Sequence, residues 1–363
     1  MGFRCGIVGL PNVGKSTLFN ALTRSGVDAQ NYPFCTIEPN VGIVEVPDER
    51  LDRISAIVNP AQVIPTAIEF VDIAGLVEGA SKGEGLGNKF LAHIREVDAI
   101  AHVVRAFEND DITHVANQID PVSDMETINT ELALADLDSV TRALDRATKA
   151  SKAGDKEQIA LKDLLTRVKD HLGEGFPART LELDAVAGQR LKHFHLLTAK
   201  PMMYVANVSE DELDGNALVD RIQEAATAEG ATVIVVSASV EQEISELAID
   251  ERGEFLEAMG LSESGLDRMI RGGYELLGLK TYFTAGKKEA RAWTFREGAT
   301  APQAAGVIHT DFEKGFIRAE TIAYDDYIEY NGEQGAKEAG KMRLEGKEYV
   351  VSDGDVMHFR FNV

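Results

Sequence analysis

Residues able to bind a triphosphate are concentrated near the N-terminus of the chain. Residues 9–17 (GLPNVGKST) match the phosphate-loop pattern G-x-x-x-x-G-K-[ST]. In such a loop the backbone N–H groups and the start of the following helix point at one anion. Lys15 would reach the β- and γ-phosphates, and the Ser16 hydroxyl would bind Mg²⁺. The residues expected to bind the phosphates are Asn12, Val13, Gly14, Lys15, Ser16 and Thr17.

A carboxylate suited to the same metal follows about sixty residues later, at the end of an apolar run, where α/β sheets place their ligands. Asp72 begins the sequence Asp-Ile-Ala-Gly, the D-x-x-G pattern of a Walker B strand. Alone this pattern is weak, but its position after a phosphate loop makes Asp72 a candidate to hold a metal-bound water. The glycine-rich residues 76–88 that follow indicate a switch loop.

Strands and helices alternate around these residues, as a phosphate loop requires. We expect strands over residues 3–8, 41–46, 68–73, 99–104, 201–207 and 232–239. Helical patterns cover residues 48–58, 89–96, 217–229 and 254–277. This alternation predicts an α/β fold with a mostly parallel sheet.

The alternation is interrupted between residues 125 and 197, where no strand pattern occurs. Apolar stripes at helical spacing precede and follow a break at residues 150–155 (ASKAGD); they consist of Leu137, Val140, Leu144 and Ala147, and of Leu161, Leu165, Val168 and Leu172. We expect an antiparallel helical hairpin, inserted into the nucleotide-binding domain as a short coiled coil. Its exposed faces could dock a partner or simply be solvated.

The last eighty or so residues have the short strands and turns of a small α+β domain. Strand patterns cover residues 282–284, 292–295, 316–321 and 356–361, with one helix near 303–309. The expected domains are therefore residues 1–124 and 199–279 for nucleotide binding, 125–198 for the helical insert and 280–363 for the C-terminal domain.

Composition limits the classes of function. The 363 residues are 44% hydrophobic and 27% charged, which is enough for full cores. The formal charge is −23, but residues 280–363 hold 12 Lys and Arg against 14 Asp and Glu, so any nucleic-acid contact should favour that segment. Only Cys5 and Cys35 occur, and no long apolar run or leader pattern is present. We expect a cytoplasmic protein without a membrane partner.

The two motifs together resemble those of a known family. Residues 9–16 with Asp72, Ile73, Ala74, Gly75 and Leu76 are similar to the Obg-related translation-factor P-loop proteins, and the whole chain resembles the Obg-like ATPase (YchF) subfamily. Residues 281–286 and 333–340 resemble that subfamily's C-terminus. The resemblance implies a Ras-like P-loop NTPase domain, a coiled-coil insert and a C-terminal TGS domain of ubiquitin-like β-grasp fold. It also implies binding to the ribosome or to its large subunit, slow ATP hydrolysis, and a role in translation or stress regulation.

The base-binding motif points to adenine. Ras-like GTPases read guanine with N-K-x-D, whereas residues 207–210 here are Asn-Val-Ser-Glu. A carboxylate would repel the adenine N1 lone pair, whereas an Asn amide can pair with the N6/N7 edge. We therefore predict ATP over GTP, with Asn207 and Val208 at the base and Ser237 and Ala238 in the bracing loop. A GTPase with relaxed or guanine specificity is the alternative.

For hydrolysis, Ser16 and Thr36 would ligate Mg²⁺ and Asp72 would hold a metal-bound water, with Lys15 stabilising the transferring charge. Leu76 stands where Ras-type enzymes carry a water-positioning Gln, and an aliphatic side chain cannot orient water. His114 is our candidate for that task, because a neutral imidazole accepts a hydrogen bond from water near pH 7. A surface histidine at a helix start is the other interpretation.

Other readings of the whole chain stay open. One is an enzyme acting on a small molecule, although no acceptor pocket can be named. Another is an RNA-binding regulatory module in which the nucleotide is structural. In the C-terminal domain the candidate phosphate contacts are Lys287, Lys288, Arg291 and Lys314. The aromatic residues there are expected in the core rather than stacking on RNA; they are Tyr282, Phe283, Trp293, Phe295, Phe312 and Phe316.

Overall fold

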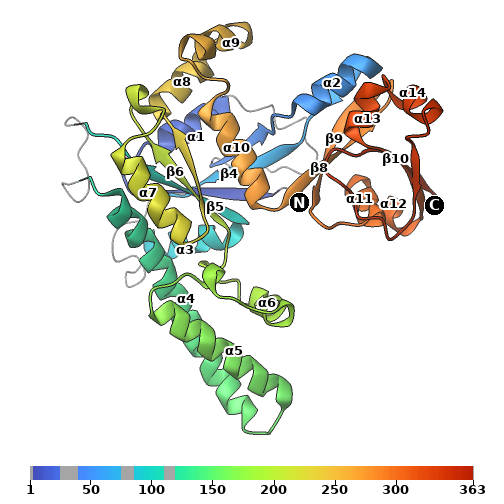
Figure 1. Ribbon diagram of the computed structural model, residues 1–363. Coiled ribbons are helices and arrows are strands. Elements are labelled where there is room, and N and C mark those ends of the chain that lie inside the picture. Colours follow the sequence, from blue (N-terminus) through green and yellow to red (C-terminus); the bar gives the residue numbers. More distant parts are fainter. Residues whose placement is uncertain (1–2, 25–39, 75–85, 110–118, 363) are drawn as a thin grey trace. The chain divides into compact units, whose positions relative to one another are not determined.

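The computed structural model describes residues 3–24, 40–74, 86–109 and 119–362 (Figure 1). The chain divides into two compact units. The first contains Met1–Ile43 and Glu69–Gly273, and the second contains Val44–Ile68 and Tyr274–Val363. In the described part of the chain, no helix has the length and apolar character needed to span a membrane.

A six-stranded sheet of order β2-β4-β1-β5-β6-β7 carries the phosphate loop. Its strands are β1 (Arg4–Val8), β2 (Val41–Glu45), β4 (Ala67–Asp72), β5 (Ala99–Arg105), β6 (Met202–Asn207) and β7 (Thr232–Val236). The pairings β1–β4, β1–β5, β5–β6 and β6–β7 are parallel. Every residue of β5 and β6 is buried, as in a parallel sheet covered on both faces. The predicted α/β architecture is confirmed.

Helices follow most of these strands. They are α1 (Lys15–Arg24), α3 (Leu86–Glu96), α7 (Ala217–Ala228), α8 (Ala238–Glu246), α9 (Ile249–Ala258) and α10 (Gly265–Leu276), with the 3-10 turn η3 (Glu210–Glu212). One expectation differs from the structure, because β7 ends at Val236 rather than at residue 239. Residue 237 is instead the N-cap of α8, a helix that the continuous apolar run concealed.

The helical hairpin consists of α4 (Pro121–Ser151) and α5 (Lys156–Gly173), which lie side by side in Figure 1. Asp120 and Asp155 cap the two helices by accepting from Ser123 N and Glu157 N at 3.3 and 2.9 Å. Because Asp120 caps and Pro121 suits a first helical turn, α4 begins before the predicted residue 125. The predicted seam is confirmed; Val140, Ala147, Leu165, Val168 and Leu172 are buried in it.

The root of the hairpin is fixed by polar contacts with the segment that returns to the sheet. This segment contains η2 (Ala178–Thr180) and α6 (Ala185–Lys192). Asp136 on α4 accepts from Leu197 N, Thr198 N and Thr198 Oγ1 at 2.9, 2.8 and 2.7 Å. Burial nevertheless raises the pKa of Asp136, and these three donors oppose that rise.

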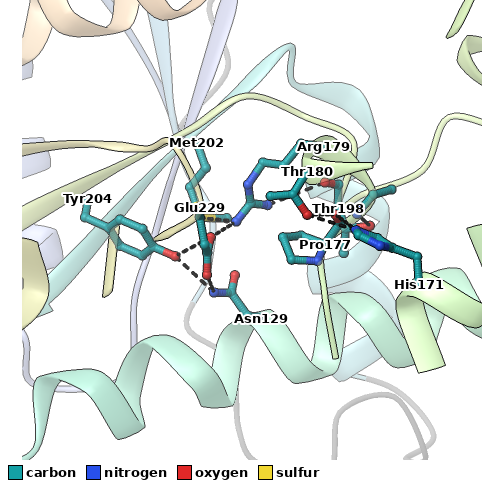
Figure 2. A network of polar contacts seen from close by, with 10 residues as sticks. Asn129, His171, Pro177, Arg179, Thr180, Thr198, Met202, Tyr204 and Glu229 are labelled. Atoms are coloured by element: carbon teal, nitrogen blue, oxygen red, sulfur yellow. Dashed lines mark hydrogen bonds and ion pairs between the residues drawn. The ribbon is translucent and has the colours of Figure 1, made fainter. Parts of the chain in front are cut away.

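A second set of contacts joins the root to the sheet itself (Figure 2). Arg179 forms an ion pair with Glu229, the C-cap of α7, and both side chains are largely buried. Tyr204 on β6 donates to Glu229 at 3.2 Å, and Asn129 on α4 donates to Tyr204 Oη and Glu229 Oε1 at 2.9 and 3.1 Å. We call Asn129, Arg179, Tyr204 and Glu229 the root network. It holds the hairpin to β6.

The second unit contains a six-stranded sheet of order β11-β10-β12-β8-β9-β3. Its strands are β3 (Gln62–Ile64), β8 (Leu279–Ala285), β9 (Glu289–Arg296), β10 (Phe316–Ile322), β11 (Arg343–Glu345) and β12 (Val356–Phe361). β12 pairs with β8 in parallel, while β8–β9 and β10–β12 are antiparallel. Tyr282, Phe283, Phe295 and Phe316 are buried, and Trp293 and Phe312 pack partly buried against the same cores, so the expectation of core aromatics is confirmed.

Two features of this unit differ from expectation. The helices are α2 (Glu49–Val58), α11 (Ala301–Ile308), α12 (Thr310–Lys314), α13 (Tyr324–Glu329) and α14 (Glu333–Glu338), so the prediction of one helix after residue 280 was wrong. Residues 44–68 group with the C-terminal residues, whereas we expected them within domain 1–124. The reason is that Leu51 and Ile54 on α2 are buried in one core with Phe283 and Ala292.

Candidate nucleotide-binding site

The phosphate loop turns between β1 and α1 through two left-handed residues. Asn12 has φ +64° and Gly14 has φ +92°. Asn tolerates this region better than most residues, and Gly adopts it without steric cost. The first helical hydrogen bond then runs from Leu18 N to Gly14 O at 3.0 Å. The backbone N–H groups at the start of α1 are thus in position to bind an anion.

Two glycines of the loop are required by space, and Gly14 is also required by its conformation. A Cβ on Gly14 would lie 2.2 Å from Asn207 Nδ2, and a Cβ on Gly9 would lie 2.8 Å from Val103 O. The loop therefore packs directly against the ends of β5 and β6. Only glycine allows such close approach.

Asn207, the last residue of β6, joins the loop to the start of α8. Its Nδ2 donates to Val13 O at 2.9 Å, and its Oδ1 accepts from Ala238 N at 2.9 Å. The side chain is 3% exposed. An amide has two N–H donors and two acceptor lone pairs, so one of each stays available. We expected Asn207 to read the base; the structure adds a bracing role that sequence reasoning missed, and the base contact stays a prediction.

The other predicted base-loop residues lie beside Asn207. Val208 is buried and its N donates to Val236 O at 2.8 Å. Ser237 is buried at the N-cap of α8, with its Oγ 3.0 Å from Ser239 Oγ. The structure thus brings together three segments that are distant in sequence, around residues 13, 207 and 238.

Lys15 and Asp72 meet at the ends of α1 and β4. Lys15 Nζ contacts Asp72 Oδ1, with side-chain exposures of 10% and 22%. Residue 72 is held next to β1 by the register Ile7↔Asp72. Phosphate oxygens would therefore compete with Asp72 for the ammonium of Lys15.

The oxygen donors at the site fit Mg²⁺, which takes oxygen ligands. Among the described residues, no group of three or more His, Cys, Asp or Glu side chains could hold a metal. Mg²⁺ bound with nucleotides uses one or two protein oxygens together with phosphates and water. The exposed Ser16 hydroxyl and the Asp72 carboxylate would supply those oxygens. Thr36, the other predicted ligand, lies outside the described residues.

Several catalytic expectations fall on parts of the chain that the structure does not describe. Gly75, Leu76 and His114 belong to residues 75–85 and 110–118. The structure does show what precedes His114. Arg105, the buried last residue of β5, donates to Phe107 O and Asn109 O at 3.1 and 3.0 Å. Burial lowers the pKa of Arg105, an effect that Asp124 opposes. The expected strand ended at residue 104, because a buried arginine at a strand end has no pattern in sequence.

A parallel sheet with a phosphate loop after β1 and a carboxylate at the end of β4 defines the class of P-loop nucleoside triphosphatases. Residues 4–138 match the family model described as "50S ribosome-binding GTPase", and residues 279–362 match the model YchF-GTPase_C, described as a protein of unknown function (DUF933). The chain belongs to the YchF family.

Its relatives are similar over their full length. Proteins called "Ribosome-binding ATPase YchF" from Pasteurella multocida, Escherichia coli O157:H7 and Bacillus subtilis are 63%, 60% and 59% identical, with 100% of both chains covered. The solved structure of the Schizosaccharomyces pombe YchF GTPase is 39% identical, with a TM-score of 0.90 over 99% of this chain and 98% of that one. A Pyrococcus horikoshii GTP-binding protein, 20% identical with a TM-score of 0.62, shares the fold over 99% of this chain and 100% of its own.

Proposed function

We propose that this chain hydrolyses ATP to ADP and phosphate as a ribosome-binding molecular switch. The observation that carries the proposal is the full-length identity of 59–63% to proteins called ribosome-binding ATPases. The paired Lys15 and Asp72 and the loop around Gly14 support the hydrolase part. A ribosome-bound protein would act in the cytoplasm.

The choice of ATP rests on residues 207–210. They lack the Lys of the guanine motif and carry the longer Glu210 in place of its Asp, and a site whose acceptor is displaced loses the contact that selects guanine. Asn207 keeps one amide N–H and one lone pair for the base edge after bracing Val13 and Ala238. Guanine specificity is the competing proposal, since the fission-yeast relative is called a GTPase.

The residues of the site divide the work of phosphoryl transfer. Backbone N–H groups at the start of α1 bind the β-phosphate, and Lys15 neutralises charge on the transferring phosphate. Ser16, Thr36 and Asp72 would hold Mg²⁺, directly or through water. The ion, when bound, offsets negative charge between the β- and γ-phosphates. The Asp72 carboxylate would therefore interact with Lys15 when the site is empty and with a water bound to Mg²⁺ when the nucleotide and the metal are present.

Water positioning is assigned to His114, because Leu76 cannot orient water. Single-turnover hydrolysis by a His114→Ala variant tests this assignment. We expect a rate at least about tenfold lower, with ATP affinity unchanged. An unchanged rate removes His114 from the mechanism without touching the rest of the proposal.

The test of the whole proposal is hydrolysis of ATP and GTP with and without purified ribosomes. We expect slow ATP turnover alone, faster turnover with ribosomes, and co-sedimentation of the protein with them. The variant Asp72→Asn should bind ribosomes and lose hydrolysis. Absence of ribosome binding, with turnover that depends on a small-molecule acceptor instead, would support an independent enzyme and contradict the switch.

A further inference from the structure

Charge is segregated along the α4–α5 hairpin. Residues 121–141 of α4 contain five Asp and Glu and no Lys or Arg. Residues 142–169, which form the far end of the hairpin, contain eight Lys and Arg against four Asp and Glu. In a chain with a formal charge of −23, this end is a positive region.

The positive side chains share one face. Arg142, Arg146 and Lys149 are spaced by four and three residues, which places them on one side of α4. All three are exposed, and so are Lys152 and Lys156 at the turn into α5. We call these five residues the basic stripe. The seam residues Val140, Ala143 and Ala147 are buried against α5, so the basic stripe is not needed to hold the two helices together.

The positive charges of the basic stripe are largely uncompensated. Arg142 pairs with Asp138 at 2.9 Å, and both are about two-thirds exposed, where an ion pair stabilises little. Asp155 is occupied by capping α5. Within the described residues, no ion pair forms at Arg146, Lys149, Lys152 or Lys156. These four cations can bind an anionic partner without losing an internal ion pair; Arg146 makes a hydrogen bond to Arg142 O at 3.3 Å.

The same compact unit carries a strongly acidic segment. Residues 209–263, which contain α7, α8 and α9, hold 15 Asp and Glu against two Lys and Arg. Such a surface repels phosphate, whereas the basic stripe attracts it. A polyanion approaching this unit is therefore oriented toward the end of the hairpin.

We propose that the basic stripe binds the phosphate backbone of ribosomal RNA, an inference that rests on the proposed ribosome-binding function. Regularly spaced exposed cations without interleaved aromatic side chains suit backbone phosphates rather than base stacking. The root network fixes the hairpin to β6, so the stripe is presented on a rigid support (Figure 2). The hairpin is then the RNA-binding arm of the protein, whereas we first expected such contacts in the C-terminal domain.

The experiment compares two full-length triple variants. Arg146→Gln, Lys149→Gln and Lys152→Gln remove stripe charge with a good helix former. Lys287→Gln, Lys288→Gln and Lys314→Gln remove the same charge from exposed sites of the C-terminal domain. Binding to purified ribosomes and to protein-free 23S ribosomal RNA is measured at several salt concentrations. Circular dichroism and basal ATP hydrolysis report on folding and should be unchanged in both variants.

We expect the stripe variant to bind RNA and ribosomes about tenfold or more weakly, with a salt slope reduced by about 2 to 3, because each phosphate contact contributes about 0.7 to 0.9. The C-terminal variant should resemble the wild type. An unchanged slope in the stripe variant would overturn the proposal, as would weaker ribosome binding with unchanged RNA binding, which indicates a protein contact. Stripe-dependent RNA binding by a wild type that ignores ribosomes would support this inference and contradict the proposed function.

Discussion

The side-chain amide of Asn207 donates to the carbonyl oxygen of Val13 at 2.9 Å, across 194 positions of sequence. The same amide accepts from Ala238 N at 2.9 Å. One buried side chain therefore ties the phosphate loop to the segment expected at the base. These two hydrogen bonds hold the phosphate-binding and base-binding segments together without any contact to a nucleotide base.

Replacing Asn207 with Asp tests this brace. A carboxylate cannot donate to Val13 O and would face it with negative charge, so we expect the free energy of unfolding to fall by about 1 to 3 kcal/mol. ATP affinity should fall by about tenfold or more, because the loop loses its support. Urea denaturation and isothermal titration measure the two effects. The control is Asn362→Asp at an exposed position, and equal behaviour of the two variants would show that Asn207 braces nothing.

Gly14→Ala tests the close packing of the loop. The new Cβ would lie 2.2 Å from Asn207 Nδ2 at a φ of +92°. Positive φ alone costs a non-glycine residue about 1 to 3 kcal/mol, and displacement of Asn207 adds to it. We expect lost stability together with strongly weakened ATP binding, measured by thermal unfolding and titration.

The matched control is Gly188→Ala within α6, where an added Cβ meets nothing within 4 Å. That change should stabilise the protein by up to about 1 kcal/mol. If Gly14→Ala were as stable as the control and bound ATP normally, the described loop packing would be wrong.

Glu229→Gln tests the root network. Arg179 would keep its burial and lose its counter-charge, so we expect a loss of about 1 to 3 kcal/mol in the free energy of unfolding. Asp138→Asn breaks an ion pair whose partners are each 65% exposed and should cost under about 0.5 kcal/mol. Chemical denaturation compares them. Equal losses would mean that the root network does not hold the hairpin.

His102 is predicted to make stability fall in acid. It is buried on β5, neither ring nitrogen has a hydrogen-bond partner among the described residues, and its ring lies 5.3 Å from that of Tyr204. Burial, with the nearby charge of Arg179, lowers the pKa of His102 to about 3. His102 is therefore protonated at a higher pH in the unfolded chain than in the folded one. The stability that neutral, buried His102 contributes above pH 6.5 is lost as the pH falls toward 3.

Between pH 7 and pH 5 this effect should lower the free energy of unfolding by about 2 kcal/mol. A His102→Phe variant should lack that part of the pH dependence, whereas the exposed His193→Gln should keep it. Urea denaturation at the two pH values measures the difference. The same pH dependence in all three proteins would contradict the assignment to His102.

Much of the fold and the phosphate half of the site could be predicted from sequence, because local patterns carry them. Residues 9–17 and Asp72 lie where the motifs placed them, and the apolar stripes of α4 and α5 form the buried seam. The roles that escaped prediction depend on contacts between distant segments. Asn207 bridging Val13 and Ala238 is such a contact. Arg105 escaped for another reason, because its contacts with Phe107 O and Asn109 O are local but a charged residue gives no sign of being buried at a strand end.

The prediction of secondary structure from sequence failed where the apolar pattern was weak, or where one apolar run continued across two elements. α13 and α14 are short helices that each bury a single residue, Tyr327 in α13 and Ala336 in α14. One buried residue gives no helical pattern in the sequence. Only Ser237 separates β7 from α8, so the start of α8 at Ala238 was predicted as strand. The grouping of α2 with the C-terminal unit depends on Leu51 and Ile54 meeting a core that lies far along the chain.

Residues 207–210 are expected to select ATP over GTP, while Asn207 also braces the phosphate loop. Isothermal titration of the purified protein with ATP and with GTP, both with Mg²⁺, tests it most directly. We expect ATP to bind about tenfold or more tightly than GTP, because Glu210 replaces the Asp that accepts from guanine and the Lys of that motif is absent from residues 207–210. Tighter binding of GTP, or binding of neither nucleotide, would contradict the account.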